Sequence, residues 1–207
     1  MPELTTTILP AIDDRPDAYD ELFREYINER ILVFNNEVTD DMVEDIVMYI
    51  LKWNSDDKDL PIDKRKKIKL YISSVGGDSF VAQNVVDVII NSKTPIIGVG
   101  LSLVASAAFH IYIACHERVA FKNSIFLMHD GSITISNSSK KAADTFAFIQ
   151  STEERTKQHV LNRTKMEPDF YDKVFDTEFY MYADGRAKEL GVVDKIIGDD
   201  VDVDYIL

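Results

Sequence analysis

The sequence predicts a single α/β domain over residues 1–207, built on a mostly parallel sheet. Short apolar runs alternate with longer stretches whose apolar residues recur at helical spacing, an order typical of right-handed β–α–β units. The chain is 45% hydrophobic, which suffices for one substantial core. No long Gly/Ser/Pro-rich linker and no repeat of solenoid period divides it.

The N-terminal quarter of the chain is predicted to contain a flexible segment, two helices and one strand. Residues 1–16 are acidic and lack the basic and apolar regions of a signal peptide, so we expect a flexible segment there. Residues 17–28 predict a short amphipathic helix, and 31–34 predict an apolar strand. Thr39 is expected to cap a helix that places Met42, Ile46, Ile50 and Trp53 on one buried face.

Two further β–α units follow the polar connection at 54–67. The first comprises a strand over 68–73, a Gly-Gly turn and a helix with its apolar face between 81 and 89. The second comprises a strand over 95–99, a Gly-rich turn and a helix over 104–115.

Residues 94–115 carry no formal charge over about the length of a membrane-spanning helix. Pro95, Gly98 and Gly100 interrupt the first third of this stretch, and polar residues interrupt the rest. These interruptions of the apolar run favour a buried strand, a turn and a buried helix, so we expect no membrane association.

The C-terminal half begins with a strand over 124–129 and a long helix over 138–163. Residues 150–159 of that helix include no apolar residue, so its middle is expected to project from its own core or to contact another subunit. A helix over 184–190, Gly191 as its C-cap and a strand over 192–197 close the fold.

Charge and cysteine content exclude several classes of function. The net charge of −13 disfavours nucleic acid and anionic membranes as partners, and the basic run at 64–69 is interpreted as a solvated loop. Cys115 is the only cysteine, which rules out an intrachain disulfide and a Cys-rich zinc site. A single thiol also fits a reducing compartment, and we expect a cytoplasmic protein with no metal and no cofactor.

Three successive strand ends carry the residues that acyl transfer needs. Gly76-Gly77 ends the second strand, Ser106 lies near the start of the helix after the third, and His129 ends the next strand. Backbone amides, a hydroxyl beside a helix N-terminus and an imidazole are the parts of a serine hydrolase. Taken alone, each is also compatible with a purely structural role.

The sequence resembles the proteolytic subunit of the caseinolytic (Clp) protease from about Arg30 to Ile197. The stretches KLYISSVGGDSFVAQNVVDVI and VASAAFHIYIAC resemble the family's oxyanion turn and its nucleophile helix. The stretches FKNSIFLMHD and AKELGVVDKII resemble the strand that ends in its base and its closing helix and strand. Gly77 and Ser106 are 29 residues apart, as expected for the family.

The resemblance implies a Clp/crotonase-like fold of repeated ββα units, with 138–163 as a projecting handle helix. It implies Ser106 as nucleophile, His129 as general base, and the amides of Gly77 and Ala107 as the oxyanion hole. It further implies an endopeptidase that cleaves unfolded polypeptides inside a chamber of two stacked heptameric rings, a tetradecamer. An AAA+ Clp unfoldase ATPase would be its partner.

Some assignments retain alternatives. Glu178 is the expected third member of the triad if one residue is inserted near Gly185, and Asp176 is the other candidate. Ser102 competes with Ser106, because a glycine lies four residues before it. Asp78 departs from the family turn, and its charge is unfavourable beside an oxyanion unless the side chain turns away. The remaining histidines, at positions 110, 116 and 159, are interpreted as structural.

Three other functions remain open at this point. A catalytically weak ring subunit would fit the altered oxyanion turn, and a phage-type maturation peptidase would share the fold. A crotonase-type acyl-CoA hydratase or isomerase would also share the fold, but it would need no Ser/His pair.

Overall fold

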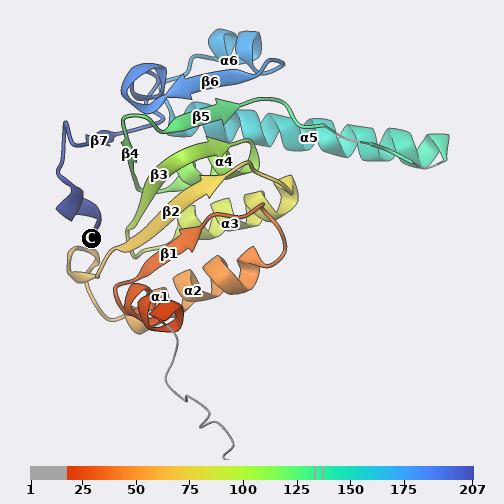
Figure 1. Ribbon diagram of the computed structural model, residues 1–207. Helices are drawn as coiled ribbons and strands as arrows, with labels where there is room; N and C mark the ends of the chain where they lie inside the picture. Colours follow the sequence, from red (N-terminus) through yellow and green to blue (C-terminus); the bar gives the residue numbers. More distant parts are fainter. Residues whose placement is uncertain (1–17, 133, 137) are drawn as a thin grey trace, which may run out of the picture.

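The computed structural model describes residues 18–132, 134–136 and 138–207 (Figure 1). The expected flexible segment at 1–16 lies outside these residues. The α-helices are α1 Ala18–Asn28, α2 Met48–Asp56, α3 Ser79–Asn91, α4 Ala107–Ala114, α5 Ser139–Arg163 and α6 Pro168–Val174. The strands are β1 Ile31–Phe34, β2 Ile68–Ser74, β3 Ile96–Ala105, β4 Glu117–Phe121, β5 Ile125–Met128, β6 Phe179–Tyr182 and β7 Lys195–Ile197. Short helical turns are η1 Val43–Val47, η2 Ile62–Lys64, η3 Ala183–Ala187 and η4 Val203–Ile206.

The sheet confirms the predicted α/β class. Its main path runs β1-β2-β3-β4-β7, and every neighbouring pair on that path is parallel. Strand β3 is long enough to pair twice: its first half pairs with β4 and its last residues pair with β5. Strand β5 then pairs antiparallel with β6. The sheet therefore branches at the end of β3, where the candidate nucleophile follows.

The main core lies between the sheet and the helices α2, α3 and α4. Strand β2 shows the reason, because Ile68, Leu70 and Ile72 alternate with partly exposed residues and are fully buried. In α4, every residue except His110 is buried, and every residue except His110 is apolar or aromatic. None of the helices in the described part of the chain has the length and apolar composition needed to cross a bilayer.

The boundaries of β3 and α4 differ from the prediction. The strand continues through the expected Gly-rich turn to Ala105, and the helix begins at Ala107 instead of 104. Gly98 and Gly100 serve close packing: an added Cβ would lie 2.9 Å from Cys115 Sγ at Gly98 and 2.8 Å from the Phe126 ring at Gly100.

Other local predictions also need correction. Thr39 does not cap the following helix, because its hydroxyl donates to Asp41 and the helical segment begins with a wider π-helical turn at η1. The prediction missed α6 and β6. The closing strand is shorter than predicted, at Lys195–Ile197, whereas Gly191 has the positive φ, 68°, expected after a helix end.

Helix α5 projects as predicted, but the polar stretch 150–159 does not project along its whole length: Lys157 pairs with Asp172 at 2.5 Å and His159 contacts the His110 carbonyl at 3.0 Å. The helix extends well beyond the body of the sheet in Figure 1, and Val160 is its only buried residue. The projecting half is not uniformly polar, however, since Phe146 and Phe148 are 52% and 58% exposed.

Candidate active site

Ser106 occupies a sharp turn between β3 and α4. Its φ of 54° lies in the left-handed region that non-glycine residues rarely adopt, a conformation common at functional sites. The turn is held because the Ser106 N–H donates to the Leu127 carbonyl at 3.0 Å and its own carbonyl accepts from Phe109 at 3.0 Å. The Ser106 side chain makes no capping hydrogen bond, so its hydroxyl is available for chemistry.

The Gly-Gly turn packs directly against this serine. A Cβ on Gly76 would lie 2.7 Å from Ser106 Cβ and 2.9 Å from Ala107 N, so only glycine allows this approach. The loop after β1 fixes the turn, since Val38 N–H donates to Gly76 and Asp78 N–H donates to Val38, both at 2.9 Å. The turn is therefore rigidly placed at the start of α4.

The two amides expected to form the oxyanion hole are free donors. Within the described residues, neither Gly77 N–H nor Ala107 N–H donates a hydrogen bond to the protein. Ala107 is the first residue of α4, where helical amides lack an internal partner. Both amides are therefore available as donors, and their role as an oxyanion hole stays a prediction.

The side chain of Asp78 turns away from this site. It caps α3, accepting from the amides of Phe80 at 2.7 Å and Val81 at 3.1 Å. The carboxylate is thus committed to the N-terminus of a helix, where the dipole favours a negative charge. Of the two expectations for Asp78, the structure shows the one that leaves the oxyanion site unhindered.

His129 lies one residue after β5 and is hydrogen-bonded to Glu178. The register pairs Met128 with Phe179, so the next positions along the antiparallel ladder, His129 and Glu178, lie opposite one another. Their Nδ1 and Oε1 atoms are 2.9 Å apart. The His129 side chain is 26% exposed and that of Glu178 is 60% exposed. The structure therefore brings Glu178 to His129, while no described hydrogen bond links Asp176 to this imidazole.

Ser106 and His129 follow adjacent parallel strands. Ala105 pairs with Leu127, so the serine and the histidine follow the same end of the β3–β5 pair. Among the contacts of the described residues, no hydrogen bond joins the Ser106 hydroxyl to the imidazole. Such contacts are often long in proteins without substrate and tighten on binding.

Ser102, the competing nucleophile, and the thiol of Cys115 lie in different surroundings from Ser106. Ser102 is exposed within β3, between the pairs Ile72–Gly100 and Ser74–Val104, where β2 has one residue and β3 has three; it is not at a helix start. Burial raises the pKa of Cys115 to about 12, so that thiol stays protonated and is a poor nucleophile.

The other histidines form contacts of their own. His110 lies in α4 with its Nδ1 buried and unpaired, and burial, His159 and His129 together lower its pKa to about 3. His159 Nε2 contacts the His110 carbonyl at 3.0 Å, and His116 Nδ1 accepts from the Ile96 amide at 3.2 Å. These hydrogen bonds support structural roles for His116 and His159, and the buried, uncharged ring supports one for His110.

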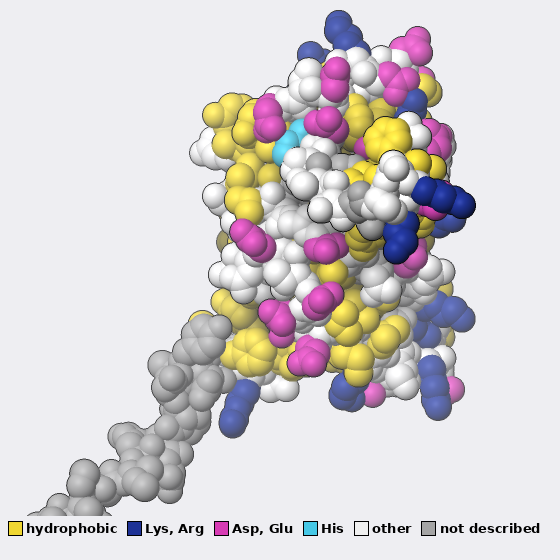
Figure 2. Space-filling view, turned by 90° about the vertical axis from the view of Figure 1, so that its right-hand side faces the viewer, with side chains coloured by type: hydrophobic (Ala, Val, Ile, Leu, Met, Phe, Trp, Pro, Cys, Tyr) yellow, Lys and Arg dark blue, Asp and Glu magenta, His cyan; other side chains and the backbone are white. Residues whose placement is uncertain are grey.

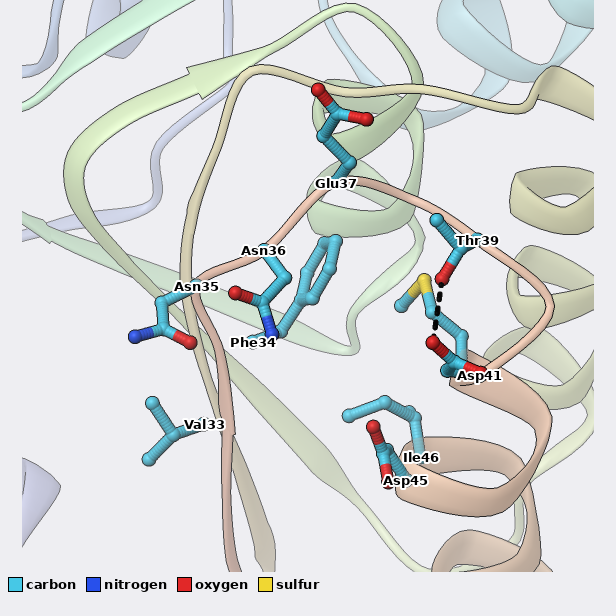
Figure 3. A pocket seen from close by; sticks show the side chains of 10 residues that line it. Val33, Phe34, Asn35, Asn36, Glu37, Thr39, Asp41, Asp45 and Ile46 are labelled. Carbon is cyan, nitrogen blue, oxygen red and sulfur yellow. Dashed lines mark hydrogen bonds between the residues drawn. The ribbon is translucent and has the colours of Figure 1, made fainter.

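A separate cavity of about 250 Å³ lies behind the loop that fixes the Gly-Gly turn (Figure 3). Glu37, Asp41 and Asp45 line it together with Asn35 and Asn36, and none of the candidate catalytic side chains does. Acidic side chains also lie scattered over the face toward which the parallel strands point (Figure 2). In the part of the chain that the structure describes, no group of three His, Cys, Asp or Glu residues is arranged to hold a metal ion.

The chain is similar to several known proteins. A sequence model described as Clp protease matches residues 14–200. The ATP-dependent Clp protease proteolytic subunits 2 of Treponema denticola and Treponema pallidum are 32% and 30% identical over 112 and 109 residues. These matches span about half of each chain, 53% and 52% of this protein and the same shares of the relatives.

A longer match and a solved structure extend the comparison. The subunit 2 of Parasynechococcus marenigrum is 27% identical over 87% of both chains. A mutant of ClpP1 from Listeria monocytogenes has a TM-score of 0.71 at 22% identity, covering 90% of this chain and 99% of the other. This structural likeness confirms the predicted fold.

Proposed function

Because the chain belongs to the Clp protease family, a family of serine proteases, we propose that it is a serine endopeptidase with Ser106, His129 and Glu178 as its triad. The observation that carries the proposal is the 2.9 Å contact between His129 and Glu178 at the end of the strand next to Ser106. An acceptor on Nδ1 leaves Nε2 to take a proton from the nucleophile.

The proposed reaction proceeds in two halves. Ser106 Oγ attacks the substrate carbonyl while His129 Nε2 takes its proton, and the carbonyl oxygen becomes an oxyanion bound by the Gly77 and Ala107 amides. The C–N bond then breaks, and His129 gives the proton to the leaving amine. Water, deprotonated by His129, attacks the acyl-enzyme and releases the second product with the Ser106 hydroxyl restored.

The strained turn at Ser106 supports these roles. A φ of 54° keeps the serine out of the helix while Ala107 starts it, so nucleophile and oxyanion donor are adjacent on one rigid element. Glu178 accepts from Nδ1–H and stabilises the imidazolium that forms during each half-reaction.

The substrates proposed are unfolded polypeptides, cleaved inside a tetradecamer of two heptameric rings in the cytoplasm. The projecting α5 supports assembly, because its exposed Phe146 and Phe148 would be buried by another subunit. An AAA+ Clp unfoldase is proposed to supply the chamber with unfolded chains.

Peptide hydrolysis by the assembled protein tests this function. Short peptides should be cleaved without ATP, and the Ser106→Ala variant should lose this activity while Ser102→Ala keeps it. Native mass spectrometry should show the same closed assembly for both variants. Activity that survives in Ser106→Ala, or an exclusively monomeric protein, would contradict the proposal.

The second candidate is a catalytically weak ring subunit. The missing hydrogen bond between Ser106 and His129 and the 60% exposure of Glu178 favour it. It predicts intact rings that cleave the same peptides no faster than the Ser106→Ala variant does.

A further inference from the structure

The C-terminal end of α4, the helix that follows Ser106, is held by an arginine. The last carbonyl groups of an α-helix lack partners within the helix. Here the guanidinium of Arg163 supplies the donors, and its Nε donates to the Ile113 carbonyl at 2.8 Å. Its Nη2 donates to the carbonyls of Ala114 at 3.1 Å and Cys115 at 2.5 Å. A planar, positively charged group suits this position, because the C-terminal end of the helix dipole is negative.

Arg163 is itself fixed at the base of α5. It is the last residue of that helix, and its carbonyl accepts from Arg118 Nη1 at 2.5 Å. Arg118, on β4, is paired with Asp194, whose carboxylate accepts from Nη2 at 2.6 Å and from Nε at 3.0 Å. Two parallel bonds of this kind define the orientation of both groups. The guanidinium of Arg163 is therefore placed relative to the sheet as well as to α4.

A second side chain of α5 contacts the backbone of α4. His159 lies one helical turn before Arg163, and its Nε2 is 3.0 Å from the His110 carbonyl. Apart from the hydrogen bond of the Tyr112 hydroxyl to the Val119 carbonyl, the side chains of α4 make chiefly apolar contacts. Apolar contacts have no preferred direction, whereas hydrogen bonds depend on distance and angle. The contacts from α5 therefore fix where α4 lies along its own axis.

The other end of α4 carries the candidate nucleophile. The helix has eight residues, so its ends are about 12 Å apart. At the N-terminal end the Ser106 N–H donates to the Leu127 carbonyl at 3.0 Å, while the first helical amide, that of Ala107, has no described acceptor. A helix of two turns moves as one body. A shift of α4 would therefore displace the serine hydroxyl and the Ala107 amide together, away from the imidazole and the Gly-Gly turn on other elements.

We propose that Arg163 is a positioning residue that holds α4 where Ser106 faces His129 and the oxyanion donors. Arg163 touches none of the reacting groups and acts through the backbone carbonyls at the far end of the helix. The inference rests on the proposed function, and it adds the residue on which the geometry of that site depends.

Peptide hydrolysis by the Arg163→Ala variant tests the proposal in protein whose assembly has been verified. The variant should show a kcat reduced roughly tenfold to hundredfold, because a misplacement of about 1 Å can cost about a hundredfold. KM should change less than about twofold, since the contacts to the substrate are kept. Arg186→Ala removes an exposed arginine whose described partner is Glu189 at 3.4 Å, and this matched control should leave both constants unchanged.

Added guanidinium separates positioning from general damage. The Arg163→Ala variant leaves space for the free ion beside the three carbonyl groups. Guanidinium chloride, far below concentrations that unfold the protein, should raise kcat of this variant at least about threefold, the equivalent of one net hydrogen bond. Sodium chloride at the same ionic strength should not. The Arg163→Lys variant keeps the charge but loses the planar fork, so its kcat should lie between those of the native chain and Arg163→Ala.

Hydrogen exchange tests the position of α4 without peptidase activity. Mass spectrometry follows the amides of residues 104–110 and 111–116 separately. In Arg163→Ala, exchange should accelerate in both segments, including the one remote from the substitution, and guanidinium should reverse the change. A role limited to the end of the helix would accelerate exchange at 111–116 alone. If the native protein cleaves no peptide, the proposed function fails, but exchange at 104–110 still decides the role of Arg163.

Three results would overturn the proposal. They are an unchanged kcat in assembled Arg163→Ala, a loss that guanidinium does not restore, and faster exchange confined to 111–116. If Arg163→Ala does not assemble, Arg163→Lys takes its place. Native values of kcat and of exchange at 104–110 in that variant would then show that the guanidinium does not position the helix.

Discussion

Replacing Glu178 with glutamine tests whether the carboxylate supports His129 in catalysis. The change keeps the size of the side chain and leaves an oxygen near Nδ1, but it removes the negative charge that faces the imidazolium formed in each half-reaction. We expect a lower kcat with little change in KM, because the interaction is strongest in the transition state.

The exposure of the pair sets the size of this effect. Opposite unit charges about 4 Å apart interact by about 1 kcal/mol in bulk water and about 4 kcal/mol near a protein surface. Glu178 is 60% exposed, which places the pair in the lower part of that range. A loss of about 1.4 to 2.7 kcal/mol corresponds to a kcat reduced roughly tenfold to hundredfold.

The assay is hydrolysis of a short fluorogenic peptide by protein whose assembly has been verified, since loss of assembly would imitate loss of the triad. Asp176→Asn is the matched control and should leave kcat unchanged. The reasoning is refuted if Asp176→Asn is the damaging change and Glu178→Gln is harmless. If neither matters, Ser106 and His129 act as a dyad without a carboxylate.

Three further predictions concern the turn, the cap and the buried imidazole. Gly76→Ala would place a Cβ 2.7 Å from Ser106 Cβ, so kcat should fall at least about a hundredfold. Gly131→Ala is the control, because the space around Gly131 is open, and it should leave kcat unchanged. Equal kcat values for the two variants would show that the close approach is dispensable. Asp78→Ala removes two capping hydrogen bonds and should lower the free energy of unfolding, measured by urea denaturation, by about 1 kcal/mol. Asp78→Asn keeps an oxygen acceptor and should lower it less. Equal losses for the two variants would contradict the capping role. Burial lowers the pKa of His110 to about 3, so the unfolded chain binds more protons below about pH 6.5, and the free energy of unfolding should fall with decreasing pH by up to about 1.4 kcal/mol per unit. His110→Leu should flatten that slope in urea titrations between pH 7 and pH 4, and an unchanged slope would assign it to other groups.

The parallel α/β architecture was predictable because strands and helices alternate with clear periodicity. The position of Glu178 was not predictable from periodicity, since the sequence-based alignment required an inserted residue near Gly185. The structure is irregular at this point, since the chain is kinked within residues 183–187 and Gly185 has non-helical angles, φ −112° and ψ −118°.

The errors around β3 have a different origin. Gly98 and Gly100 resemble turn residues, but they lie within the strand. They are glycines because Cys115, at the end of α4, and Phe126 of β5 approach the strand too closely for a side chain. Tertiary packing of this kind leaves no local signal, as glycine serves turns and close contacts alike. The capping role of Asp78, in contrast, could have been predicted from an aspartate directly before a helix.

Covalent labelling followed by peptide mass mapping tests the central claim most directly. A fluorophosphonate reacts only with a serine whose hydroxyl is activated by a base and whose oxyanion is stabilised. The account predicts that the label is found on Ser106 of the assembled protein and is lost in His129→Ala. A label found on Ser102, or an assembled protein that takes up no label, would contradict it.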